Sequence, residues 1–422
     1  MMPGGSQLCP EVHAVPHVGH TQATGGPGGA RRKWAIVDRA ALIWSPDLAA
    51  YDLGEAHPLN PLRLTLAVEL MEAFGILSPD SVISPREATE SELLLVHSSG
   101  YLESVRHADD WATDFRPVMG LGTEDNPTYP GMYELAALTC GGSIQGIEEV
   151  LSGRRRRTFS IAGGMHHAHR SRAAGFSVYN DVAVGIAVAR QQQPRLKVLY
   201  VDIDAHHGDG VQEAFASSVE VLTISIHESG LYAFPGTGFP GEIGYGPGAG
   251  FSANVPVPAY ATDDCFALAF DGVVAPLARA FRPDIVVAQL GVDAHHADPQ
   301  TDLGLTLPGY RSLVRGIIGL SDELCEGRLA AVGGGGYHIV DVVPLAWTWV
   351  MAELGGVRLR DEVPDVWRAQ VRSRLGCEPP RSMGERDRFD SPAERAERVL
   401  ALTAERVREV REAVFPHHGL AP

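Results

Sequence analysis

Residues 198–210 read VLYVDIDAHHGDG, and this stretch says more about the fold than any other part of the chain. Its first half is apolar and β-branched, which is typical of a parallel strand buried on both faces. Its second half is polar and contains two glycines, which is typical of a loop that leaves the strand. Because side chains alternate along a strand, Asp202, Asp204 and His206 emerge on the same side. The stretch therefore predicts a buried strand with a binding site at its carboxyl end.

Other short apolar runs recur along the chain and alternate with longer stretches of helical periodicity. The apolar runs are Ala35–Val37, Phe159–Ala162, Val221–Ile226, Ile285–Leu290 and Leu329–Val332. The helical stretches include Pro61–Phe74, Met132–Leu151, Tyr310–Glu326 and Pro344–Leu354. This alternation predicts an α/β fold with a single doubly wound, mainly parallel β-sheet flanked by helices. All of these runs except the first end in polar or glycine-rich segments, so we expect the active site at the carboxyl ends of the strands.

Composition divides the chain into three parts. Residues 1–33 are rich in Gly and Pro and predict a flexible N-terminal extension. Residues 34–356 contain the alternating strands and helices and form the predicted catalytic domain. Residues 357–422 contain two charge-dense helical stretches, at 361–375 and 391–414. We expect this C-terminal helical extension to pack on the catalytic domain, and an interaction arm is the alternative.

The charge balance limits the classes of partner. The chain has 52 acidic and 35 basic residues and a net charge of −17, which disfavours nucleic acid as a partner and favours basic substrates. No apolar run reaches the roughly 18 residues that a membrane span requires, so we expect no membrane partner. Residues 1–33 lack the continuous apolar stretch of a secretory signal. A cytoplasmic protein is therefore expected.

The polar loop after residue 201 predicts a metal centre. The carboxylates of Asp202 and Asp204 would repel each other at a buried strand end unless a cation lay between them. Together with the imidazole of His206 they suit zinc or another divalent first-row metal. Asp293, which follows the run Ile285–Leu290, is the best candidate for a third ligand. The alternative is a set of surface residues that cap the next helix.

Two other strand ends carry residues suited to amide hydrolysis. His166 and His167 follow a glycine pair, and histidine can act as base or acid near neutral pH. Asp202 and Asp209 are candidates to fix their tautomers. Tyr337 follows four glycines and could donate a hydrogen bond to a developing oxyanion. For each segment taken alone, ordinary core or turn residues are the alternative.

Two loops present an aromatic side chain that could line a narrow tunnel for an alkyl chain. Gly175 precedes Phe176 in one loop, and Phe234 lies in the other. Plain packing is the alternative for each ring. His295 and His296 follow the predicted ligand Asp293, and we expect them to be solvent-exposed loop residues, with tuning of substrate choice as the alternative.

Taken in order, the motifs resemble the histone deacetylase superfamily and, within it, the bacterial acetoin-utilisation-type deacetylases. The resemblance extends from about Trp34 to Gly356 and rests on HPLNPLR, GLGTEDNPTYPGMYE, GGMHHAH, GFSVYND, VLYVDIDAHHGDGVQ, TISIHESGLYAFPGTG, LGVDAHHADP and GGGGYHIVDVVP. It implies the arginase/deacetylase fold and a zinc-dependent lysine deacetylase. Such an enzyme hydrolyses Nε-acetyl-lysine in proteins to lysine and acetate, with His167 as general base. Zn²⁺ is the expected ion, and Fe²⁺ is the alternative ion in the cell.

The resemblance also implies roles for individual residues. The metal ligands are Asp204, His206 and Asp293, and the catalytic residues are His166, His167, Tyr337, Asp202 and Asp209. The substrate tunnel contains Gly175, Phe176 and Phe234, and Arg63 lies below it. One structural potassium site involves Asp202, Asp204, His206 and Ser225, and a second involves Phe215, Ser218, Val221 and Phe251.

The implied partner is an acetylated lysine of a protein substrate, and the acetoin-utilisation resemblance suggests an acyl-CoA synthetase. An acetylpolyamine or another small N-acyl-amine is the alternative substrate. An arginase-like hydrolase with two manganese ions and a catalytically silent acyl-lysine binder are more distant alternatives. The sequence leaves the oligomeric state open.

Overall fold

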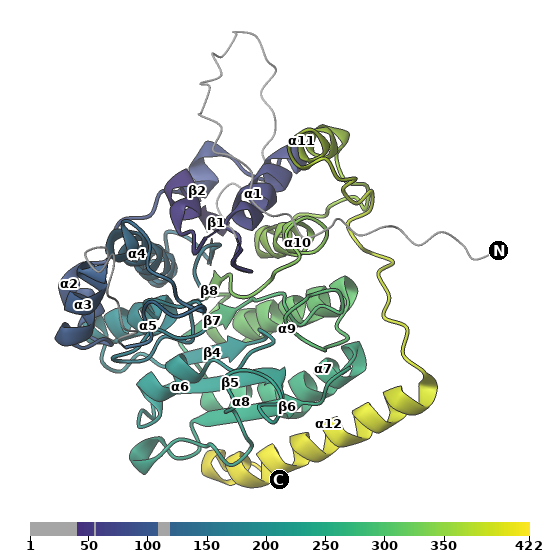
Figure 1. Cartoon of the computed structure of the whole chain (residues 1–422). Coiled ribbons are helices and arrows are strands. Elements are labelled where there is room, and N and C mark those ends of the chain that lie inside the picture. The colour runs from purple at the N-terminus through teal and green to yellow at the C-terminus, as the bar shows by residue number, and fades with distance from the viewer. Residues whose placement is uncertain (1–39, 55, 109–118) are drawn as a thin grey trace.

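An eight-stranded sheet runs through the molecule in the order β2-β1-β3-β8-β7-β4-β5-β6, and every strand pair in it is parallel (Figure 1). The computed structural model describes residues 40–54, 56–108 and 119–422. The prediction of a single parallel sheet flanked by helices is confirmed. The strands are β1 (Ala40–Ile43), β2 (Val82–Ile83), β3 (Arg157–Ser160), β4 (Val198–Asp202), β5 (Val221–Glu228), β6 (Ser252–Val257), β7 (Ile285–Gln289) and β8 (Leu329–Val332).

Helices cover both faces of this sheet (Figure 1). Along β4, Leu199 and Val201 belong to one buried apolar cluster, whereas Val198 and Tyr200 belong to another. This alternation explains why the strand sequence is almost continuously apolar. The α-helices are α1 (Leu62–Phe74), α2 (Glu90–Leu93), α3 (Ser99–Arg106), α4 (Met132–Leu151), α5 (Asp181–Gln192), α6 (Asp209–Phe215), α7 (Asp263–Ala269), α8 (Ala275–Phe281), α9 (Leu307–Cys325), α10 (Val343–Gly355), α11 (Asp365–Leu375) and α12 (Ala393–Val414).

The central strands agree with the predicted runs, whereas β1 and the edge strands β2 and β6 were not predicted. The predicted run Ala35–Val37 lies outside the described residues. Strand β6 was not predicted, because its sequence SANVPV is weakly apolar and contains Pro256. Proline is tolerated there because β6 is an edge strand. Helix α5 was also missed, although Asn180 caps it by accepting a hydrogen bond from the Ala183 N–H at 2.9 Å.

The two C-terminal helices pack on different parts of the molecule, α11 on helix α1 and α12 on strand β6. In α11, the indole N–H of Trp367 donates to the Leu66 carbonyl of α1 at 3.0 Å. Helix α12 runs along the edge strand β6, with Val410 and Val414 buried (Figure 1). Covering an edge strand removes a surface that could pair with another chain. The predicted extension at residues 1–33 lies outside the described residues, and the division into domains stays a prediction. None of the helices in the described ranges has the length and apolarity needed to cross a membrane.

Candidate active site

Three predicted metal ligands meet at the carboxyl ends of two neighbouring strands. Asp204 and His206 follow β4, and Asp293 follows β7, which pairs with β4. Their ligand atoms all lie within 4.8 Å of one another. His206 Nδ1 is 2.9 Å from Asp293 Oδ2 and 3.4 Å from Asp204 Oδ1. The structure thus brings together the three residues that the sequence proposed from separate strands.

The surroundings of these side chains suit a divalent cation. Both carboxylates are buried, with Asp204 1% and Asp293 0% exposed. Asp204 Oδ2 accepts the Gly335 N–H at 2.7 Å, and Asp293 Oδ1 accepts the Ala205 N–H at 2.8 Å. Each carboxylate therefore has its second oxygen directed toward the shared centre. Two buried carboxylates that converge in this way need a positive charge between them, and an O, N, O donor set fits zinc.

The tandem histidines lie beside this centre, and each is held by a carboxylate. His166 Nδ1 lies 2.9 Å from Asp202 Oδ2, and His167 Nδ1 lies 2.8 Å from Asp209 Oδ1. Because ionised carboxylates only accept, each Nδ1 donates its proton to the carboxylate. The phenol of Tyr200 also donates to Asp202, at 2.6 Å. The predicted pairing of these histidines with Asp202 and Asp209 is present.

The two histidines differ in their charge at neutral pH. Burial and the neighbouring His166 lower the pKa of His167 to about 4, despite the opposing effect of Asp209. His167 is therefore neutral, and its Nε2 has a free lone pair. Burial would also lower the pKa of His166, but Asp202 and Asp204 outweigh it and raise that pKa to about 9. A cation held by Asp204 would offset part of this increase. Divergent pKa values in one pair of groups are typical of acid–base sites.

The loop that carries the histidines is fixed by residues that the sequence analysis gave no role. Asp181 accepts the Met165 N–H at 2.7 Å, and Asn180 donates to the His166 carbonyl at 3.1 Å. Gln289 donates to the Gly164 carbonyl at 2.8 Å. The motif GFSVYND contains Asn180 and Asp181, so the sequence already pointed to these two residues. Their hydrogen-bond partners could be identified only from the fold.

Tyr337 lies at the end of the glycine loop after β8. Its backbone N–H donates to Asp298 Oδ2 at 2.8 Å. The buried Arg63 donates through Nη1 to the carbonyls of Gly334 and Gly336, at 2.8 and 3.0 Å. These glycines have φ values of +127° and +145°. Residues with a side chain rarely adopt such values, so glycine is required at both positions. Burial raises the pKa of the Tyr337 phenol well above its ordinary value, so the phenol remains a hydrogen-bond donor.

A narrow cavity connects these groups. It measures ≈ 20 Å³, enough for one or two water molecules, and its lining includes His166, His167, Asp204, His206 and Tyr337. Of the predicted tunnel residues, Gly175 and Phe176 line it, and Phe234 packs beside it on His167. The Phe176 and Tyr337 rings lie 5.9 Å apart, and the Phe234 and His167 rings 4.9 Å apart. A Cβ atom on Gly175 would come within 2.5 Å of His167 and 2.8 Å of Phe234. Glycine therefore makes room for both rings.

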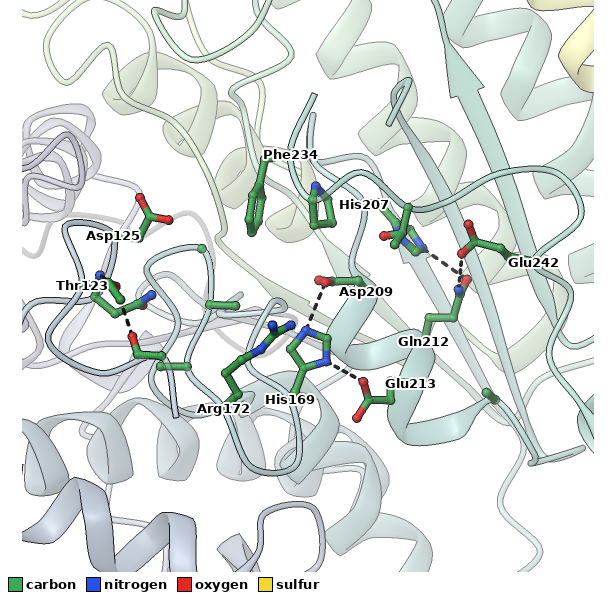
Figure 2. Close-up of a pocket in the computed structure, with 18 residues that line it drawn as sticks. Thr123, Asp125, His169, Arg172, His207, Asp209, Gln212, Glu213, Phe234 and Glu242 are labelled. Carbon is green, nitrogen blue, oxygen red and sulfur yellow. Dashed lines mark hydrogen bonds and ion pairs between the residues drawn. The ribbon is translucent and has the colours of Figure 1, made fainter. Parts of the chain in front are cut away.

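A wider pocket of ≈ 540 Å³ adjoins this cavity and shares Gly175 and Phe234 with the predicted tunnel (Figure 2). In this pocket His169 lies between two carboxylates, with Nδ1 2.5 Å from Glu213 Oε2 and Nε2 3.2 Å from Asp209 Oδ2. The second contact is an ion pair without the alignment of a hydrogen bond. Both carboxylates raise the pKa of His169 to about 9, so it is a cation. Sequence reasoning gave this third histidine of GGMHHAH no role.

The residues predicted to bind potassium have ordinary protein contacts in the described part of the chain. Asp202 pairs with Ser225 in the sheet, and the Ser225 hydroxyl lies 2.8 Å from His227 Nδ1. At the second predicted site, the Phe215 carbonyl accepts the Ser218 N–H at 2.8 Å, and the Phe251 carbonyl accepts the Thr223 N–H at 3.0 Å. Val221 begins β5 close by. Potassium binding stays a prediction.

The expectation that His295 and His296 are solvent-exposed is wrong. His295 is only 4% exposed, and His296 is partly buried. Both rings lie against Asp387, at 2.8 and 2.9 Å. Asp387 belongs to the segment between α11 and α12, so its approach could not be read from the local sequence.

Comparison with known proteins identifies the family. The model of the histone deacetylase domain matches residues 57–354. The chain belongs to the histone deacetylase family. It is 40% identical over 330 residues to the acetoin utilization protein AcuC of Bacillus subtilis strain 168, covering 78% of this chain and 85% of that protein. It is 37% identical over 320 residues to AcuC of Staphylococcus aureus strain MRSA252, covering 75% of this chain and 82% of that protein.

Solved structures of the family give the same result. This chain is similar to the crystal structure of a histone deacetylase homologue from Aquifex aeolicus, with a TM-score of 0.77 and 30% identity. The match covers 87% of this chain and 100% of the homologue. The same values apply to a homologue complexed with SAHA. The expected arginase/deacetylase fold is therefore confirmed, and the protein is a hydrolytic deacetylase.

Proposed function

We propose that this histone deacetylase family member is a zinc-dependent lysine deacylase that releases acetate from Nε-acetyl-lysine in proteins. One observation carries the proposal. Asp204, His206, the neutral His167 and the protonated Tyr337 line a single narrow cavity, and Asp293 completes the group of convergent donors with Asp204 and His206. This combination supports metal-assisted hydrolysis of an amide.

Side chains of this protein account for the proton transfers. A divalent ion held by Asp204, His206 and Asp293 would supply a Lewis acid that polarises the acyl carbonyl and acidifies water. His167 accepts the proton of the attacking water at Nε2, because Asp209 fixes the other ring nitrogen as the donor. The Tyr337 phenol donates to the carbonyl oxygen as negative charge develops on it. The imidazolium of His167 then passes its proton to the departing amine, which restores the neutral base.

The shape of the entrance supports a long alkyl amine as substrate. Phe176 and Phe234 supply apolar ring faces beside His167 and Tyr337, which suit the methylenes of a lysine side chain. The net charge of −17 favours the approach of a basic protein segment. An acetylated acyl-CoA synthetase is the proposed protein partner, by likeness to the acetoin utilization proteins. Zn²⁺ is the proposed ion, Fe²⁺ the alternative in the cell, and K⁺ the proposed structural ion.

The first experiment measures acetate release from an acetyl-lysine peptide by zinc-loaded protein and by metal-free protein. Release should depend on zinc, and His167→Ala should lower kcat by about 10² to 10⁴-fold because the general base is lost. Zinc content and thermal unfolding of the variant serve as controls for folding. Absence of release from folded, zinc-loaded wild-type protein would overturn the proposal.

An acetylpolyamine is the second candidate substrate, and the pocket at the entrance favours it. Four acidic residues line this pocket, Asp125, Asp209, Glu213 and Glu242, of which Asp209 and Glu213 also pair with His169. A polycation without a peptide backbone could contact them as readily as a protein segment could. Parallel measurement of kcat/KM for acetylspermidine and for the peptide decides between the two substrates. The preferred substrate should have a kcat/KM at least about tenfold higher than the other.

A further inference from the structure

A side chain from the C-terminal segment holds the loop between β7 and α9. Asp387 Oδ2 lies 2.8 Å from His295 Nε2, and Asp387 Oδ1 lies 2.9 Å from His296 Nε2. The same carboxylate accepts the backbone N–H of Leu307 at 3.0 Å, where α9 begins. Asp387 lies outside residues 57–354, the part of the chain that matches the family model. The loop is therefore held from a segment beyond the matched domain.

Two imidazoles and a carboxylate could also hold a metal ion, but the tautomer of His295 argues against this. The backbone N–H of Ala297 donates to His295 Nδ1 at 3.1 Å. The neutral ring therefore carries its proton on Nε2, which donates it to Asp387. A metal ion at Nε2 would require the proton on Nδ1, where it would face the Ala297 N–H. The cluster is thus a hydrogen-bonded clamp.

The clamped loop carries two parts of the active site. Asp293, the third metal ligand, lies two residues before His295, and its carbonyl accepts the Thr301 hydroxyl at 2.5 Å. Asp298 lies three residues after His295 and accepts the backbone N–H of Tyr337 at 2.8 Å. A shift of this loop would therefore move both a metal ligand and the oxyanion donor.

The segment around Asp387 also packs closely on the loop. The Phe389 ring lies 5.6 Å from the His296 ring, at an angle of 32°. A Cβ atom on Gly304 would come within 2.5 Å of Phe389, so this glycine makes room for the ring. Farther along, the Trp349 indole N–H donates to the Met383 carbonyl at 2.9 Å, which attaches the segment to α10. These contacts fix Asp387 relative to the core.

We propose that Asp387 is a positioning residue of the metal centre, which acts through His295 to hold Asp293 and through the same loop to orient Tyr337. The inference rests on the proposed metal-dependent function. It assigns part of the C-terminal segment to the reaction, although that segment contributes no group to the cavity.

Asp387→Asn tests the clamp, because asparagine keeps the shape but can accept only one of the two imidazole N–H groups. We expect zinc to leave the variant about tenfold faster in the presence of a chelator, as for other partners of metal-binding groups. The rise in Tm that zinc produces should become smaller, and kcat should fall with little change in KM. The matched control is Asp390→Asn, an exposed carboxylate in the same segment, which should behave as wild type. His296→Leu removes a single clamp contact and should give an intermediate rate of zinc loss.

Three results would overturn the proposal. The first is zinc loss from Asp387→Asn at the wild-type rate. The second is an equal decrease in Tm of the zinc-loaded and metal-free forms, which would indicate a purely structural role. The third is two zinc ions per wild-type chain and one in the variant, which would make the cluster a metal site. If wild-type protein releases no acetate but Asp387→Asn still loses zinc faster, the clamp stands and the proposed function fails.

Discussion

His169 shows how one residue links the pocket to the catalytic pair, since its cation neutralises Asp209, the partner of His167 (Figure 2). We predict that His169→Gln destabilises the protein in a pH-dependent way. The folded-state pKa of about 9 exceeds the unfolded value of about 6.5, so the stabilisation is fully present below pH 6.5 and is lost as pH rises through 9. After allowance for solvent screening, the loss should be about 1 to 2 kcal/mol. Urea unfolding at pH 6, 8 and 10 measures it.

Arg172→Gln is the matched control for this prediction. Arg172 lines the same pocket, but among the described residues it forms no ion pair with Asp209. Its substitution should produce no loss that disappears between pH 6.5 and 9. A His169→Gln effect of equal size at all three pH values would show that the side chain acts through packing.

Among the individual residues of the site, the sequence predicted those that directly follow a strand. Asp204 and His206 could be predicted because the period of two along β4 places them on one side. Asn180, Asp298 and His169 could not, because their roles depend on partners that lie far away in the chain or on another loop. His295 was misjudged for the same reason, since Asp387 lies 92 residues away.

Among the elements, the glycine loop after β8 is held by a distant residue, Arg63 of α1. Arg63→Met would keep most of the volume but leave the carbonyls of Gly334 and Gly336 buried without their donor. The free energy of unfolding should fall by about 2 to 4 kcal/mol. Because Tyr337 would then be held only through Asp298, kcat should fall at least about tenfold while KM changes less. Denaturant unfolding and steady-state kinetics measure the two effects.

Arg157 offers a matched comparison for Arg63. It is also a buried arginine, and its Nη1 donates to the Leu354 carbonyl at 3.0 Å, at the start of β3 and away from the active site. Arg157→Met should reduce stability by a similar amount and leave kcat unchanged. Equal kcat values for the two variants would contradict the role given to the loop.

The elements themselves were predictable where both faces of a strand are apolar. Strands β4, β7 and β8 lie in the centre of the sheet, so their sequences are apolar up to the last residue of β4 and β7 and throughout β8. Edge strands carry weaker patterns, which is why β6 and the two-residue β2 were missed. The predicted convergence of the loops was correct, because all strand pairs in the described sheet are parallel.

For the whole molecule, the excess of acidic residues should affect the rate at which substrates arrive. A net charge of −17 attracts basic peptides over a distance that shrinks as salt is added, from about 30 Å at 0.01 M to about 8 Å at 0.15 M. We predict that kcat/KM for an acetyl-lysine peptide flanked by lysines falls about three- to tenfold between these salt concentrations. A peptide flanked by glutamates should respond in the opposite direction, and kcat at saturation should change little for either. Identical salt dependence for the two peptides would mean that the tunnel and its immediate surroundings govern binding. The net charge of the protein would then have no effect on the rate at which substrates arrive.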